Sequence, residues 1–339
     1  QKFVLDNLGI PFILTVPVMV MLIWFYTRKG GIKTLVWTDT FQTLCMFSAL
    51  ILIIYYTIKC LDFTPMEAYH AICDSKYSQI FVFDDWISRQ NFWKQFLSGI
   101  FVVIVMTGLD QDMMQKNLTC KTLRDAQKDM CTYGFAFVPA NLLFLALGIL
   151  LILLAQKQQM PFPESPDDLL PMFAASGYMG NIVVIFFTIG IVAASFSSAD
   201  SAITAITTSI CVDIIDSPKD EKLRKYTHLG VAILFVIFII LFKQINSTSV
   251  IDAIYIICSY TYGPLLGIFG FGIFTKRRAN DQVTPYIAIL SPIICYAIDW
   301  YSSHHLGYKL GYELLMLNGL ITFSGLYLFS HKNNAKICA

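Results

Sequence analysis

The sequence is poor in charge and lacks the common short motifs of catalysis and metal binding. Asp, Glu, Lys and Arg make up only 14% of the 339 residues, and their formal sum is +1. A near-neutral chain offers no basic surface for nucleic acid. The nine cysteines are scattered, without a CxxC pair or a cluster of Cys with His, so no structural metal site is expected. HExxH and GxSxG are absent too, and no acid pairs with a histidine inside an apolar stretch, which argues against an enzyme.

Apolar residues dominate what is present. They account for 56% of the chain, and the mean hydropathy is +0.62, which is typical of a protein whose solvent is the lipid bilayer. Stretches of about 20 apolar residues are long enough to cross a membrane as helices. The sequence therefore predicts an all-α membrane protein with nine spans. These are Leu8–Tyr26, Thr34–Ile58, Trp93–Met114, Met130–Ala155, Asn181–Val212, Tyr226–Phe242, Val250–Thr275, Thr284–Tyr301 and Tyr312–Ser330.

The basic residues predict the orientation of these spans. Lys and Arg collect at alternate span ends, which carry twice as many as the other ends, and the richer side is expected to be cytoplasmic. Gln1 would then lie outside and Ala339 inside. Cys60 and Cys73 share an outer loop, where they could form a disulfide or remain two free thiols.

The stretch Ile189–Ile214, IGIVAASFSSADSAITAITTSICVDI, breaks the apolar pattern inside a span. Successive residues of a helix are about 100° apart, and this spacing divides the stretch into two faces. One face carries Ser197, Ser198, Asp200, Ser201, Thr204 and Thr208. The other carries Val192, Phe196, Ala199, Ile203, Ile206 and Ile210. We predict that the hydroxyl face points into the protein and that the apolar face, with Phe196 and Ile203, points away from it.

Two interpretations of the hydroxyl face stay open. Serine and threonine in membrane helices often bond to the preceding turn of their own helix. Alternatively, oxygen atoms at membrane depth suit a hard cation such as sodium. Asp200 favours the second interpretation, because an ionisable residue inside a membrane is costly and usually functional.

Two other spans contain features of broken helices. In the third, Gly108 precedes Asp110 and Gln111, which fits a helix that breaks at mid-membrane; the alternative is a span that ends there with a solvated acidic cap. In the seventh, Gly263-Pro264 predicts a kink, and Gly263 with Gly267 predicts a notch for close helix packing.

Four polar and aromatic residues beside these features are candidates for substrate binding or gating: Asp110, Gln111, Tyr260 and Tyr262. The tyrosines could line a pathway, or they could pack as ordinary aromatic residues.

Four of these stretches, taken together, resemble the sodium:solute symporter family. GGIKTLVWTD, DQDMMQKNL, AASFSSADS and TYGPLLGIFGFGIFTKR occur in the family's order and spacing between about Ile32 and Arg278. The resemblance implies the inverted-repeat fold of the bacterial leucine transporter, in which two five-helix repeats cross the membrane in opposite senses. Counted against that fold, the nine spans match core helices four to twelve.

The same count predicts a division of the chain. Residues 1–58 would hold the last two helices of the first repeat, 59–92 an outer loop, 93–275 the second repeat, and 276–339 two trailing helices and a cytoplasmic tail. The N-terminal helices of the fold would then be missing partners of this chain, and much of the substrate pocket would lie on them.

The family's shared sodium site uses an Ala-x-x-Ser-Ser pattern, which Ala194, Ser197 and Ser198 match here. Some members have a second cation site made by an aspartate and nearby hydroxyls. Asp39 matches that aspartate, and Ser198 and Ser201 match hydroxyl positions. Asp200 departs from the family pattern, since serine is expected there. An extra carboxylate could strengthen cation binding or carry a proton.

The resemblance implies a secondary active transporter in the plasma (inner) membrane, of bacterial origin. Na⁺ entering down its gradient would drive uptake of a small organic solute, with sugars, sialic acids, amino acids and carboxylates all open. One charge crossing the membrane releases about 2.3 kcal/mol per 100 mV, which is sufficient for accumulation. The alternative is a transporter-like membrane domain that serves as a sensor.

Overall fold

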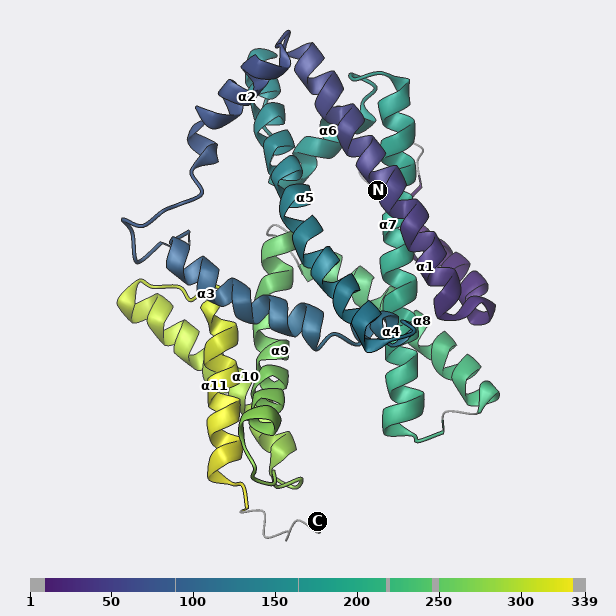
Figure 1. Ribbon diagram of the computed structural model, residues 1–339, viewed down its shortest axis with the longest axis vertical. Coiled ribbons are helices and arrows are strands. Elements are labelled where there is room, and N and C mark those ends of the chain that lie inside the picture. Colours follow the sequence, from purple (N-terminus) through teal and green to yellow (C-terminus); the bar gives the residue numbers. More distant parts are fainter. Residues whose placement is uncertain (1–9, 89, 164, 218–219, 246–249, 332–339) are drawn as a thin grey trace. The chain divides into compact units, whose positions relative to one another are not determined.

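The computed structural model describes residues 10–88, 90–163, 165–217, 220–245 and 250–331, and these residues are overwhelmingly helical (Figure 1). Within these ranges the only β-type pairing is an isolated bridge between Arg278 and His331. The α-helices are α1 Phe12–Cys60, α2 Pro65–Cys73, α3 Phe92–Val103, α4 Gln111–Leu118, α5 Leu123–Lys157, α6 Leu169–Ala175, α7 Asn181–Thr208, α8 Glu221–Ile245, α9 Val250–Phe274, α10 Thr284–Tyr301 and α11 Glu313–Leu328.

Helices cover all nine predicted spans within the described residues; the predicted start of the first span at Leu8 lies outside them. Length and composition qualify five helical stretches to cross a membrane, and a bent helix pair makes a sixth. The five are Asp39–Cys60, Leu123–Lys157, Asn181–Ile214, Glu221–Gln244 and Ala253–Phe274. The apolar stretches Phe12–Thr27 and Glu313–Leu328 are shorter. The all-helical membrane architecture is thus confirmed.

The chain divides into two compact units. Unit 1 comprises residues 1–78 and 115–249, and unit 2 comprises residues 79–114 and 250–339. In unit 1, one apolar core joins the C-terminal part of α1 to α5, α6 and α7, with Leu50, Leu150 and Phe187 among its buried side chains. A second core packs the N-terminal part of α1 against α7 and α8, around Ile23 and Ile203.

Helix α1 lies along α7 (Figure 1), and its contacts show that it does not follow α7 as one straight rod. Tyr26 contacts Asp200, and Asp39 contacts Ser197. The 13 positions from Tyr26 to Asp39 would extend about 20 Å in a straight helix, whereas the three positions on α7 rise by about one turn. Two distant parts of α1 therefore meet the same turn of α7.

The predicted break in the third span is confirmed. α3 passes into a π-helical turn at Ile104–Gly108, and the axis of α4 is then bent by 55°. Asp110 caps α4: its Oδ1 accepts the backbone N–H groups of Asp112 at 2.9 Å and Met113 at 3.2 Å. The break and the acidic cap are not alternatives in this structure but occur together, because a helix restarted inside a span needs acceptors for its first N–H groups.

The predicted packing notch in unit 2 is also confirmed. A Cβ atom on Gly263 would overlap the side chain of Asn318 on α11, and one on Gly267 would overlap Thr322 and the carbonyl of Gly319. Helices α9 and α11 lie side by side (Figure 1), and the distances to Asn318, Gly319 and Thr322 show that they approach closely at these glycines.

The segment between α1 and α3, predicted to be an outer loop, contains the short helix α2. Thr64 and Glu67 form a capping box at its start, in which each side chain accepts the other residue's backbone N–H. Cys60 and Cys73, for which a disulfide and free thiols were both open, are free thiols.

Candidate functional site

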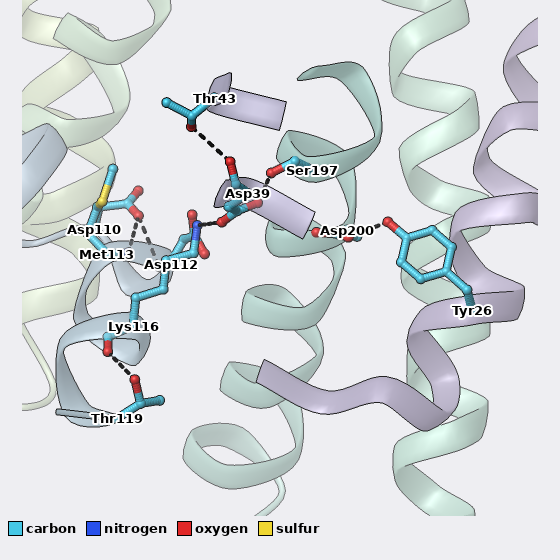
Figure 2. Close-up of polar contacts among 10 residues, drawn as sticks. All are labelled: Tyr26, Asp39, Thr43, Asp110, Asp112, Met113, Lys116, Thr119, Ser197 and Asp200. Carbon is cyan, nitrogen blue, oxygen red and sulfur yellow. Dashed lines mark hydrogen bonds and ion pairs between the residues drawn. The ribbon is translucent and has the colours of Figure 1, made fainter. Parts of the chain in front are cut away.

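Asp39 and Ser197 make one half of a polar cluster in unit 1 (Figure 2). The Ser197 hydroxyl on α7 donates to Oδ1 of Asp39 on α1. The Lys116 ammonium on α4 lies 3.0 Å from Oδ2, and both side chains of this ion pair are only 27% exposed. Both carboxylate oxygens of Asp39 therefore face positive or hydrogen-bond-donating groups, as a carboxylate held away from water requires.

Asp200 makes the other half of the cluster, one turn further along α7. Its side chain is completely buried, and Oδ2 accepts a hydrogen bond from the hydroxyl of Tyr26 (Figure 2). The ring of Tyr26 stacks on Phe196 with centroids 6.4 Å apart. Within the described residues Oδ1 of Asp200 has no hydrogen-bond partner, and neither has the buried hydroxyl of Ser201. Adjacent buried oxygens of this kind are costly and are typical of ligand sites.

The prediction for the two faces of α7 is right in part. Ser197, Asp200 and Ser201 are buried as expected. Ser198 is exposed in this structure, and Ala194 is half-buried. Ile203, predicted to point away from the protein, is 0% exposed.

The correction has a simple physical reason. The prediction placed Ile203 with the lipid-facing residues, but α1 and α8 cover that part of α7 with an apolar core that includes Ile203. Seen down the axis of α7, the buried side of the helix therefore includes Ile203, Asp200 and Ser197, and Ser198 lies just outside it. Sorting residues by angle separates polar from apolar positions, but it does not reveal where neighbouring helices pack.

A cavity of about 690 Å³ adjoins the cluster in unit 1. Its walls are mostly apolar and aromatic, and Ser197 on α7 belongs both to these walls and to the cluster. Tyr26, Trp37, Phe41, Thr188, Ile189, Val192, Ala193, Phe196 and Ser197 line it. A cavity of this size and composition, with few polar groups, is typical of a site for a small organic ligand.

Sequence reasoning missed two residues of the cluster. Tyr26 ends the first apolar span, where an aromatic residue at the membrane interface needs no special explanation. Lys116 is one of the basic residues at the span ends from which the orientation is predicted. Only the meeting of α1, α4 and α7 reveals their roles. A usable signal existed for Lys116, because a carboxylate expected inside a membrane span, such as Asp39, predicts a nearby cation.

The remaining candidates lie in unit 2. Asp110 caps α4, and Gln111 is exposed at the first position of that helix. Tyr260 is half-buried and its ring lies 6.5 Å from that of Tyr296, which is ordinary aromatic packing. Tyr262 is also half-buried, in the same turn of α9.

The chemistry of the cluster suits a hard cation. Its ligands are carboxylate and hydroxyl oxygens, which favour alkali and alkaline-earth ions over transition metals. Throughout the described part of the chain, no three His, Cys, Asp or Glu side chains come together as a metal-binding group.

Comparison with known proteins agrees with this fold and chemistry. The model of the sodium:solute symporter family matches residues 1–282. The human sodium-coupled monocarboxylate transporter 2 is 25% identical over 280 residues, covering 74% of this chain and 42% of that protein. A sodium/sialic acid symporter of Aliivibrio fischeri is 25% identical over 305 residues, covering 84% of this chain and 59% of that one. The chain thus spans about half the length of the curated relatives it matches.

A solved structure shares the fold. It is described as the substrate-bound outward-open state of a Na⁺-coupled sialic acid symporter with a novel Na⁺ site. It superposes with a TM-score of 0.78 at 19% identity and covers 97% of this chain and 70% of its own. With the family match over most of the sequence, these findings show that the chain belongs to the sodium:solute symporter family.

Proposed function

We propose that the protein takes part in secondary active transport, coupling the entry of Na⁺ to the uptake of a small organic solute. The observation that carries the proposal is the cluster of Asp39, Ser197 and Asp200, which places two carboxylates and a hydroxyl together inside membrane-spanning helices. Such a group is expensive to bury and gains stability from a bound cation. Na⁺ is here a transported substrate.

Two ion sites follow from the proposal. The first uses Ala194, Ser197 and Ser198, through a backbone carbonyl and two hydroxyls. The second uses Asp39, Ser198, Asp200 and Ser201. The open oxygens of Asp200 and Ser201 support the second site, because they are adjacent on α7 and neither is used in a hydrogen bond within the described residues.

The proposed architecture is the leucine-transporter-like inverted repeat. It has nine transmembrane helices, core helices four to twelve, within the divisions 1–58, 59–92, 93–275 and 276–339. The bent third span supports it, because broken helices carry the binding sites of this fold. The proposed location is the inner membrane of a bacterium, with basic loops on the cytoplasmic side.

The solute is proposed to be a small organic acid. The relatives are named for monocarboxylates, vitamins and sialic acid, so carboxylates are the first class to test. Asp110, Gln111, Tyr260 and Tyr262 are the proposed substrate-binding or gating residues.

Uptake into proteoliposomes tests the proposal. A panel of radiolabelled monocarboxylates, sialic acids, amino acids and sugars is supplied with an inward gradient of sodium, and then of potassium. The proposal expects at least one solute to accumulate only with sodium. Equal uptake with either ion, or accumulation of no solute in the panel, would count against it.

A further inference from the structure

Helix α9 contains a proline in its interior, which leaves one backbone carbonyl without its usual partner. Pro264 has no N–H group, so it cannot donate to the carbonyl of Tyr260, four residues earlier. In a membrane span no water is available to take the place of that donor. The carbonyl of Tyr260 therefore needs a hydrogen bond from another helix.

Asn318 on α11 supplies that hydrogen bond. Its side-chain amide nitrogen donates to the carbonyl of Tyr260 at 2.9 Å and to that of Ser259 at 3.0 Å. Asn318 is 0% exposed. Both amide protons are thus directed at the two carbonyls that lie one turn before Pro264.

The side-chain oxygen of Asn318 is hydrogen-bonded by a residue of α10. The hydroxyl of Ser291 donates to Oδ1 of Asn318, and it also lies 3.0 Å from the backbone carbonyl of the same residue. A hydroxyl donor on Oδ1 fixes which side of the amide presents its N–H groups to α9. Asn318 therefore links three helices, with every polar atom of its side chain in use.

The glycines of α9 make this approach possible. Because a Cβ atom on Gly263 would occupy the position of the Asn318 side chain, no other residue fits there without displacing the amide. Gly267 admits Thr322 one turn further along in the same way. Pro264, Gly263 and Asn318 thus depend on one another for this packing, although they lie on two helices and more than 50 positions apart in the sequence.

We infer that Asn318 is a positioning residue, which binds the backbone carbonyls one turn before Pro264 in α9 and thereby fixes the turn that carries Tyr260 and Tyr262. The part that concerns gating rests on the proposed transport function. The part that concerns the backbone of α9 does not. Asn318 acts through the carbonyls of α9 and needs no contact with a solute.

A double-mutant cycle of thermal stability tests the backbone part. Asn318→Leu should lower the Tm of the purified protein by several degrees, because the carbonyl of Tyr260 loses its donor. Pro264→Ala restores an N–H at position 264 that can bond to this carbonyl within α9. In that background the decrease caused by Asn318→Leu should fall to roughly half or less. Equal decreases in both backgrounds would overturn the inference and make Asn318 an ordinary packing residue.

Two further variants serve as a control and as a replacement in case Asn318→Leu does not fold. Asn141 on α5 is an exposed asparagine whose amide bonds to its own helix at Phe137, so Asn141→Leu is the matched control and should leave the Tm unchanged. If Asn318→Leu is not recovered as folded protein, the same cycle is run with Asn318→Ser. This smaller change also removes the amide, and an equal decrease in both backgrounds contradicts the inference as before.

Transport provides the second measurement. If Asn318 positions Tyr260 and Tyr262, Asn318→Leu should raise the KM for the solute about tenfold and leave the half-maximal sodium concentration unchanged. Pro264→Ala should restore part of the loss. A parallel change in both constants would contradict the gating part. Absence of sodium-driven uptake in the wild type would instead count against the proposed function, and the Tm cycle would still decide the backbone part.

Discussion

The two units bury polar groups in opposite ways. Unit 1 contains acidic groups held largely away from water: Asp39 is half-buried and paired to Lys116, and Asp200 is fully buried and bonded through only one of its oxygens. Unit 2 buries a neutral amide, Asn318, whose donors and acceptor are all used. The first arrangement leaves free energy to be gained by binding a cation, whereas the second gains its full stability from the protein itself. The difference separates a candidate cation site, whose stability we propose to increase on ion binding, from a hydrogen-bond network that the protein completes by itself.

The largest expected effect is on the charged cluster. Asp39→Asn removes the negative charge that meets Lys116 and Ser197, so sodium-dependent uptake should fall at least tenfold, which corresponds to about 1.4 kcal/mol. The matched control is Asp62→Asn, since Asp62 pairs with Lys157 at 2.7 Å but is 85% exposed. An exposed pair contributes little, so this control should stay within about twofold of wild type. Similar losses in both variants would show that the burial of the Asp39 pair is irrelevant.

The second effect concerns stability and should have opposite signs in the two units. Asp200→Asn replaces a buried charge by a neutral group of the same shape, so it should stabilise the protein by about 1 kcal/mol while transport declines. That gain would raise the Tm by about 2–4 °C. Asn318→Leu in unit 2 should lower the Tm instead. If Asp200→Asn lowers it as well, Asp200 is a structural residue and the contrast between the units fails.

A smaller effect is expected at Lys116. Its ammonium lies against Oδ2 of Asp39, where it competes with any cation that binds this carboxylate. Lys116→Met should therefore lower the half-maximal sodium concentration about fivefold, as loss of about 1 kcal/mol of competing attraction implies. Lys157→Met, which removes the exposed ion pair, is the control. An increase in the sodium requirement would show that Lys116 supports the cation site.

The smallest effect tests a polar contact outside the membrane spans. The backbone N–H of Thr64, followed by its hydroxyl, lowers the pKa of Glu67 below its ordinary value of 4.5. A lowered folded-state pKa means that the capping box stabilises α2 above pH 4.5 and loses that contribution as the pH falls through the folded value. Hydrogen exchange in α2, corrected for intrinsic rates, should show weaker protection at pH 3 than at pH 6. Glu67→Gln should remove most of this pH dependence, and an unchanged difference would contradict the assignment.

Much of the fold could be predicted from the sequence because the membrane imposes simple rules. The length of the apolar runs predicted nine spans, and the structure has helix in each of them. Gly108 with Asp110 predicted the break in the third span. The notch at Gly263 and Gly267 followed from residue size alone. These features depend on local sequence, where length, hydropathy and glycine have direct physical meaning.

The site was predictable only where one helix carries the signal. Ser197 and Asp200 stand out because they are polar residues inside an apolar run, and Asp39 was identified by its match to the aspartate of the family's second cation site. Tyr26 and Lys116 do not, since each has an ordinary explanation in its own segment. The exposure of Ser198 and the burial of Ile203 depend on which neighbours pack against α7, and angular position along one helix does not contain that information.

The most direct test of the account is equilibrium binding of radiolabelled sodium to the purified protein. Wild type, Asp39→Asn, Asp200→Asn and the double variant are compared, with potassium as the competing ion. The account predicts saturable binding that potassium does not displace at equal concentration. For the second of the two proposed sites, it predicts at least a tenfold loss of affinity in each single variant and little further loss in the double variant, because the two carboxylates share one ion there. Wild-type affinity in both single variants, or independent and additive losses, would contradict it.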